Sequence, residues 1–146
     1  MTTSYIGATL SVSADAPASE DATGYGALSW TEVGRVISIG EFGDQSQDIS
    51  FDVLKIGRTV HASGPKDIGE VPVVIEYDGA DAGQTLVKDN NNTNTSLSFQ
   101  ITDPDGASIY FFGLVANLRY NERTASNYKG QSFVIRGQSA LVETTP

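Results

Sequence analysis

The stretch from 71 to 87 changes its hydrophobic period, and this change limits the folds open to the chain. Up to Tyr77 apolar residues recur at every second position, which is the pattern of a half-buried strand. Beyond Ala80 they fall at helical spacing on one narrow, small-residue face. A helix this narrow does not found a helical core. We therefore predict one short helix that lies on a sheet or closes its open end.

The bounds of this helix follow from its capping residues. Asp81 with Gln84 three residues later resembles a capping box, and Asp78 is a competing N-cap if the helix starts earlier. The asparagine run 90–92 is expected to end the helix. The helix is predicted at about 79–90.

The rest of the chain alternates as strands do, so the expected fold class is mainly β. A nine-residue polar loop, 40–48, is expected to join two of these strands as a long-loop hairpin. The sequence 103–106, DPDG, predicts a tight turn joining two others. The predicted strands are 5–12, 28–39, 49–56, 58–63, 71–77, 96–102, 107–120 and 131–142.

The strand at 107–120 is apolar on both faces. Phe111 and Val115 lie on one face, and Tyr110 and Phe112 lie on the other. In a two-layer sandwich only one face of a strand meets the core. This strand therefore needs a second cover, supplied by the helix or by another subunit.

Length and composition indicate one domain, 1–146, large enough for a real core. Two polar segments stand out: 13–27, read as a flexible acidic loop or arm, and the tail 143–146. There are no cysteines, which excludes disulfides and thiolate chemistry. No apolar run approaches the roughly 18 residues of a membrane helix, and the N-terminus does not resemble a signal peptide. We expect that the protein does not associate with a membrane and that it is made in a cytoplasm.

The net charge of −9 is unevenly distributed. Up to Leu54 the chain carries eight acidic residues and a single basic one, Arg35. Such a surface repels phosphate, which argues against tight nucleic-acid binding but not against a protein past which DNA slides. Solubility alone also explains this acidity.

No constellation of catalytic residues appears. One histidine and no cysteine leave only carboxylates as metal ligands, and neither a phosphate-binding glycine loop nor a nucleophile elbow is present. We expect no enzymatic activity, no catalytic or metal-binding residues and no cofactor.

Three blocks resemble, in order, the major tail tube proteins of long-tailed bacteriophages of the lambda-like, siphophage or gene-transfer-agent type. They are SWTEVGRVISIGEFG at 29–43, GPKDIGEVPVVIEYD at 64–78 with the DAGQTLVKD helix after it, and TSLSFQITDPDGASIYFFGLVANL at 95–118. No single block is diagnostic, and the likeness extends over about 28–142.

The resemblance implies a two-sheet β-sandwich or barrel with one flanking helix. It also implies hexameric rings that stack into a hollow tube for DNA, with sheets of neighbouring subunits pairing around the lumen. Expected partners are further copies of the chain and the tail tip, tape measure and tail terminator proteins, with DNA passing through without sticking. The expected location is the virion tail.

Within this framework we assign candidate roles to individual residues. Candidates for an acidic lumen lining are Asp48, Asp52 and Glu76. Candidates for the ring-to-ring contact are Glu20, Asp21, Glu41, Phe42 and Asp44. Candidates for the contact within a ring are Tyr110, Phe112, Leu114 and Leu118.

The alternative is a monomeric carbohydrate-binding or adhesion β-sandwich. It needs an exposed aromatic platform, for which Trp30, Tyr25 and Tyr120 are the available members. A glycoside-cleaving sandwich is a third reading, disfavoured by the missing catalytic set. Self-assembly separates the first reading from the other two.

Overall fold

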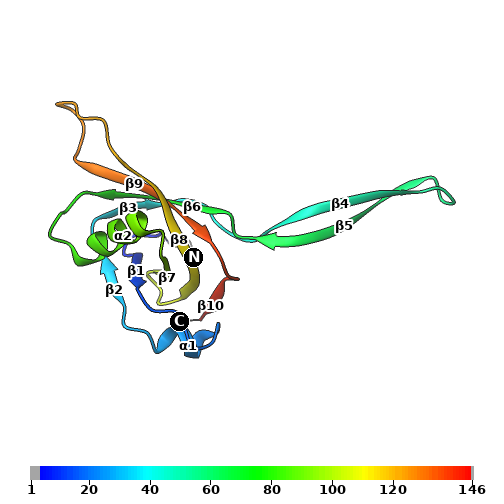
Figure 1. The fold of residues 1–146 in the computed structure, drawn as a ribbon, viewed down its shortest axis with the longest axis horizontal. Coiled ribbons are helices and arrows are strands. Elements are labelled where there is room, and N and C mark those ends of the chain that lie inside the picture. Colours follow the sequence, from blue (N-terminus) through cyan, green and yellow to red (C-terminus); the bar gives the residue numbers. More distant parts are fainter. Residues whose placement is uncertain (1–3, 146) are drawn as a thin grey trace.

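The computed structural model describes residues 4–145. It is mainly β with two sheets, as the sequence predicts, and it has a second small helix besides the predicted one (Figure 1). The large sheet runs in the order β2, β1, β7, β8, β9, β6, β3, with every neighbouring pair antiparallel, and β10 pairs with β8. Its strands are β1 (Thr9–Ser13), β2 (Thr31–Val33), β3 (Val36–Ile39), β6 (Glu70–Glu76), β7 (Ser96–Thr102), β8 (Ser108–Tyr120), β9 (Gly130–Gly137) and β10 (Val142–Thr144).

The two ends of this sheet are brought together by the chain itself. β2 and β3 stand at opposite ends of the strand order, yet only Gly34 and Arg35 separate them. Arg35 has a φ of 61°, a left-handed conformation that breaks the single strand predicted at 28–39. Because two residues span little distance, the sheet must curl into a barrel-like shape around its core.

The interior of the curled sheet is filled by aliphatic and aromatic side chains. Phe99 and Phe111 stack at the centre, with ring centroids 5.4 Å apart. These rings remove a large apolar area from water and dominate the stabilisation. Other fully buried core residues are Leu10, Val12, Val71, Val73, Leu97 and Ile135.

Helix α2 (Ala82–Thr93) packs over β8, β2 and β1 and buries Val87 in the core. It begins later than the predicted bound of about 79, because Asp81 is the N-cap and accepts a hydrogen bond from the Gln84 amide. The helix also continues through the asparagine run 90–92 and ends at Thr93, with Asn94 as its left-handed C-cap at a φ of 56°. No helix among residues 4–145 is long and apolar enough to cross a membrane.

The N-terminal segment 13–27 packs against the outside of the sheet. It contains α1 (Ala22–Gly26), and its Tyr25 is fully buried. The Tyr25 ring stacks on Tyr110 of β8, with centroids 5.4 Å apart, and Trp30 donates a hydrogen bond to the Tyr25 carbonyl. Part of the second cover that β8 requires therefore comes from the chain's own N-terminal segment.

The second sheet is a long ribbon of two strands that projects from the barrel. It consists of β4 (Gln45–Val53) and β5 (Arg58–Asp67), and it extends far to one side (Figure 1). The hairpin predicted between 28–39 and 49–56 is wrong, because β3 pairs with β6 and β4 pairs with β5. The apolar residues of β4, which alternate as core residues do, instead lie on this projecting ribbon.

Candidate assembly surfaces

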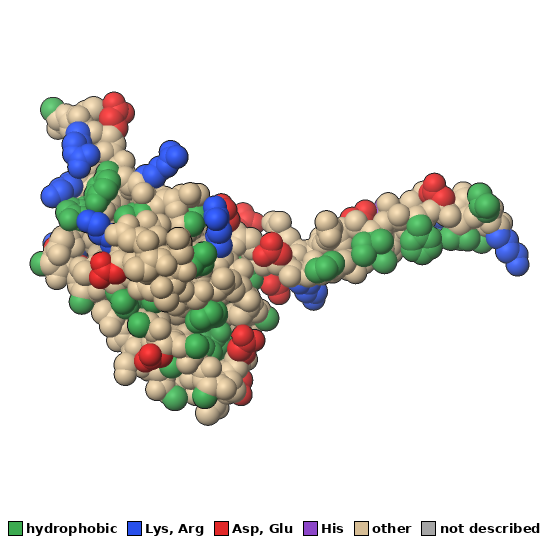
Figure 2. All heavy atoms as spheres, viewed as in Figure 1, with side chains coloured by type: hydrophobic (Ala, Val, Ile, Leu, Met, Phe, Trp, Pro, Cys, Tyr) green, Lys and Arg blue, Asp and Glu red, His purple; other side chains and the backbone are tan. Residues whose placement is uncertain are grey.

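One face of the ribbon is apolar and open to solvent. Phe51 lies opposite Val60, and Ile49 lies opposite Ala62. The Phe51 side chain is 53% exposed, and Leu54 at the ribbon's turn is 97% exposed. Figure 2 shows these hydrophobic side chains gathered along one side of the ribbon. A two-stranded hairpin with no layer beneath it is marginally stable in water, so this face is suited to a partner.

The opposite face of the ribbon is polar, and it carries two of the candidate lumen residues. Asp48 contacts the His61 ring nitrogen Nδ1 at 3.2 Å, and Asp52 accepts a hydrogen bond from Thr59 at 2.7 Å. The third candidate, Glu76, lies elsewhere, at the end of β6, where it pairs with Arg35 at 3.5 Å. The structure thus groups Asp48 with Asp52 and separates Glu76 from them.

Both long edges of the ribbon are also unpaired within residues 4–145. β4 and β5 hydrogen-bond only to each other, so each has one row of free backbone donors and acceptors. Free sheet edges recruit further strands unless they are blocked. The ribbon therefore offers an apolar face and two edges to other chains.

A groove lies on the barrel beside the base of the ribbon. It has a volume of about 1260 Å³, more than the roughly 300–1,000 Å³ of a small-molecule pocket. Its apolar lining comes from β3, the segment before β1 and the start of β8, and it includes Ile6, Ile37 and Ile109. Four acidic residues and no basic ones line it: Glu41, Asp44, Asp103 and Glu143. The groove therefore suits an apolar and cationic segment.

The groove brings together three of the five candidate ring-to-ring residues. Glu41 and Asp44 are exposed at its rim, while Phe42 packs inward with its ring centroid 6.2 Å from that of Phe111. Glu20 and Asp21 lie apart, beside α1. Asp21 is the N-cap of α1, and hydrogen bonds from the Gly24 amide and the Ser19 hydroxyl lower the pKa of its carboxyl group.

The candidate residues for contact within a ring divide between two faces of β8. Tyr110 lies under Tyr25, and Phe112 and Leu114 are half-buried on the same outer face. Leu118 instead packs against the core, because Asn117 adopts a φ of 55° and the register shifts between Ala116 and Arg119. This bulge reverses the alternation on which the assignment of Leu118 rests.

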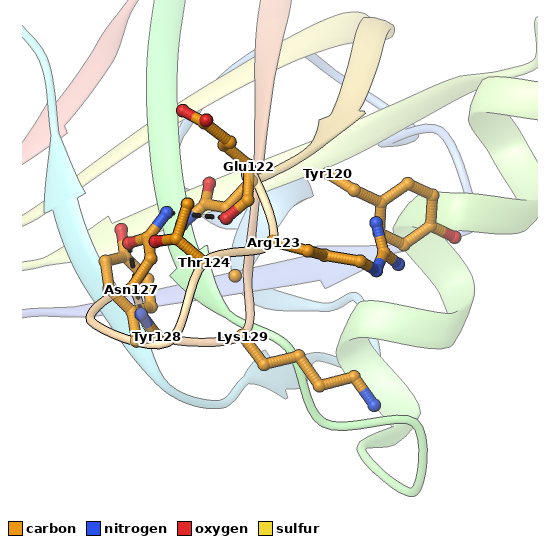
Figure 3. A pocket seen from close by; sticks show the side chains of 9 residues that line it. Tyr120, Glu122, Arg123, Thr124, Asn127, Tyr128 and Lys129 are labelled. Atoms are coloured by element: carbon orange, nitrogen blue, oxygen red, sulfur yellow. Dashed lines mark hydrogen bonds between the residues drawn. The ribbon is translucent and has the colours of Figure 1, made fainter.

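The loop between β8 and β9 forms a cationic and aromatic end of the molecule (Figure 3). Arg123 lies over the Tyr120 ring at 5.6 Å, and Lys129 lies over the Tyr77 ring at 4.6 Å. A hydrogen bond with Tyr120 raises the pKa of Lys88 on α2. These cation–aromatic contacts order the loop, and the cavity beside it is small, about 260 Å³.

Among residues 4–145 no three His, Asp or Glu side chains gather in a way that could hold a metal ion. The aromatic platform of the alternative reading is also not assembled. Tyr25 is buried, and Tyr120 lies near Tyr77, away from Trp30 and Tyr110.

The sequence analysis missed the ribbon and the burial of Tyr25. The two strands of the ribbon were predicted at 49–56 and 58–63, but not their pairing or projection; the signal for their tight turn is LKIGR at 54–58, where Gly57 adopts a φ of 59°. That pattern indicates a turn with an uncovered apolar tip. No signal in 13–27 distinguishes Tyr25 from an exposed tyrosine.

Comparison with known proteins finds likeness in structure alone. No family of sequences matches the chain, and no curated protein does. The tail of an empty gene transfer agent particle superimposes with a TM-score of 0.67 and 11% identity, over 93% of this chain and 96% of the other. The tail tube of SPP1 gives 0.64 and 12%, over 95% and 77%. A chain of the PVC extracellular contractile injection system, from its sheath/tube terminator, gives 0.68 and 9%, over 99% and 98%.

These likenesses extend over nearly the whole chain. At identities this low the comparison identifies the fold. The chain has the fold of phage-type tail tube proteins.

Proposed function

We propose that the chain is the structural subunit of a tail tube, which closes into hexameric rings that stack into a hollow conduit for DNA. The observation that carries this proposal is the ribbon β4–β5, an amphipathic two-stranded sheet that no other part of the described chain covers. Its apolar face and free edges need other chains. The fold that this chain shares with chains of tail particles supports a tube as the assembly that these other chains form.

The acidic charge supports the conduit. A chain of net charge −9 repels the phosphate backbone, so a lumen lined by Asp48, Asp52 and Glu76 lets DNA pass without sticking. Phe112 and Leu114, half-buried on the outer face of β8, are proposed to contribute to contacts within a ring, whereas Tyr110 and Leu118 are covered by the chain itself. Glu20, Asp21, Glu41, Phe42 and Asp44 are proposed to contribute to contacts between rings.

The role is structural and non-enzymatic in this proposal, and the place of action is the virion tail. The subunit is made in the host cytoplasm and meets tail tip, tape measure and tail terminator proteins at the ends of the tube. No specific observation favours the carbohydrate-binding alternative, because its aromatic residues do not form a platform.

Electron microscopy of the purified protein in negative stain tests this proposal. Samples should cover a range of protein concentration and ionic strength, with and without added tail-tip proteins. We expect rings or hollow tubes. A chain that stays monomeric in every condition, including with tail-tip proteins present, contradicts the proposal.

A further inference from the structure

The tip of the ribbon is a preformed, uncovered element. Its turn is closed by a hydrogen bond from the Gly57 amide to the Val53 carbonyl at 2.9 Å. Leu54 and Ile56 are 97% and 60% exposed there, next to Lys55 and Arg58. The tip thus presents two apolar side chains and two cations with no acid among residues 54–58.

The ribbon is also the segment of the molecule that can approach another copy without charge repulsion. Residues 45–67 contain three acids and three bases, so their formal charge is zero and the whole excess of −9 lies elsewhere. Two acidic bodies repel each other over the roughly 8–10 Å of a Debye length at physiological salt. A neutral ribbon with a cationic tip can approach a second copy with less electrostatic repulsion than the acidic barrel can.

The groove beside the base of the ribbon has the complementary character. Its lining combines apolar side chains with four acids, Glu41, Asp44, Asp103 and Glu143, and no basic residue. Ile37 of β3 is 54% exposed within it. Two apolar side chains match the apolar part of this lining, and two cations match its acids.

The tip cannot reach the groove of its own chain. Asp44 lines the groove and immediately precedes β4, whose nine residues lead straight away from it (Figure 1). At about 3.3 Å per residue, the tip lies on the order of 30 Å from the groove. The occupant must therefore come from another copy.

We propose that the ribbon tip of one copy, with Leu54 and Ile56 leading, seats in the groove around Ile37 of a second copy. Lys55 and Arg58 then face Glu41 and Asp44 of that second copy. This inference rests on the proposed function and deepens it by naming the surface that receives the ribbon. The contact joins two different patches, so it is heterologous and propagates into a ring or a stack.

Cysteine crosslinking tests the contact directly, because the natural chain has no cysteine. L54C and I37C are prepared as separate variants, mixed under assembling conditions and oxidised. A disulfide requires Cα atoms about 4.4–6.8 Å apart, so a linked dimer reports the contact. The matched control is L54C mixed with S126C, whose cysteine lies in the exposed β8–β9 loop.

We expect disulfide-linked dimers from L54C with I37C and none from L54C with S126C. Tubes that form normally without this disulfide overturn the groove contact and leave the proposed function standing. A disulfide in particles that are not tubes supports the contact and counts against the proposed function. If neither tubes nor the disulfide form with tail-tip proteins present, both the groove contact and the proposed function are overturned.

A charge exchange provides a second readout that does not depend on oxidation. K55E/R58E should lose assembly, since it places four acids of the groove against two new ones. E41K/D44K in a mixed sample should restore assembly with K55E/R58E. Loss without restoration overturns the pairing of these four residues.

Discussion

At the scale of single residues, Gln84 holds together three parts of the molecule that are distant in sequence. Its Nε2 donates to the Gly34 carbonyl at 2.8 Å and to the Glu76 carbonyl at 2.9 Å, and its Oε1 accepts from the Asp78 amide at 2.9 Å. The side chain is buried. The sequence predicts Gln84 as half of a capping box, but its carboxamide instead joins the β2–β3 junction to the end of β6.

Replacing Gln84 by alanine should therefore be costly. Q84A leaves three part-buried backbone groups without this partner, and an unsatisfied buried group costs about 1–3 kcal/mol. We expect a loss of about 2 kcal/mol in the free energy of unfolding, measured by urea denaturation. Q47A, at an exposed position of the ribbon, serves as the control and should change it by less than about 0.5 kcal/mol. Equal stability of the two variants contradicts this role.

Asp21 makes the N-terminal segment sensitive to acid. Hydrogen bonds from the Gly24 amide and the Ser19 hydroxyl lower the pKa of the Asp21 carboxyl group. The ionised carboxylate therefore stabilises this segment above the ordinary aspartate pKa of about 4, and this stabilisation is lost as the pH falls through the lower, folded-state pKa. Trp30, the only tryptophan, is hydrogen-bonded to the Tyr25 carbonyl and reports on this segment.

We therefore expect Trp30 fluorescence to change below about pH 4 in the natural sequence. In D21N the asparagine caps the helix without titrating, so this acid step should be absent. An identical acid step in both proteins would assign the change to other carboxyl groups.

At the scale of elements, alternation predicted the strands well and their surroundings poorly. Strands β6, β7 and β8 lie close to their predicted ranges, since their apolar residues face a core made by the same chain. The strand predicted at 131–142 instead ends at Gly137, and a separate strand, β10, takes in part of the predicted polar tail. Ile49, Phe51 and Val53 alternate in the same way, yet they lie on a ribbon without a core beneath it. Periodicity reports that a face needs burial, but not which chain buries it.

The bounds of α2 show a second reason for error. Asn90 was expected to end the helix because asparagine favours caps and turns. In the structure Asn90 is buried, and its Nδ2 donates to the Leu86 carbonyl at 2.8 Å. Tertiary packing overrides the local preference, and the left-handed cap falls to Asn94.

The apolar face of the ribbon should matter for assembly and little for the folding of the barrel. F51D places a charge at the centre of that face, where a neighbouring copy would have to desolvate it. We expect loss of tubes in electron microscopy, with a change of less than about 1 kcal/mol in the urea unfolding of the subunit. S50D, which adds the same charge on the polar face opposite His61, is the control and should assemble. Tubes of normal length from F51D contradict the role of this face.

At the scale of the whole molecule, the groove is a product of topology. Its lining comes from residues 5–8 and 36–44 and from Ile101, Asp103, Ile109, Leu141 and Glu143, which only the strand order brings together. The sequence identified Glu41 and Asp44 as contact candidates from their loop, but nothing in the sequence places them beside Ile109 or Leu141. Pairing of β1 with β7, of β7 with β8 and of β10 with β8 brings the other lining segments together, and the curl of the sheet brings the end of β3 beside them.

The distribution of charge leads to a prediction about DNA. If the polar face of the ribbon lines the lumen, tubes of the natural sequence should leave short double-stranded DNA unbound at physiological salt. D48K/D52K should retain it in a salt-dependent manner, measured by cosedimentation. D15K/E122K makes the same change of charge at exposed positions away from the ribbon. Equal retention by the two variants would contradict a lumen position for Asp48 and Asp52.

The ribbon occupies a particular place in the chain, between β3 and β6, which are themselves antiparallel partners. The Gly40 amide donates to the Pro72 carbonyl at 2.7 Å, so the two strands are already joined across the point where the ribbon leaves the barrel. The ribbon is thus an insertion in a hairpin. Its length and surface can diverge, or be redesigned, while the strand order of the barrel is preserved. Subunits with one common body can acquire new spacings and new neighbours through this insertion alone.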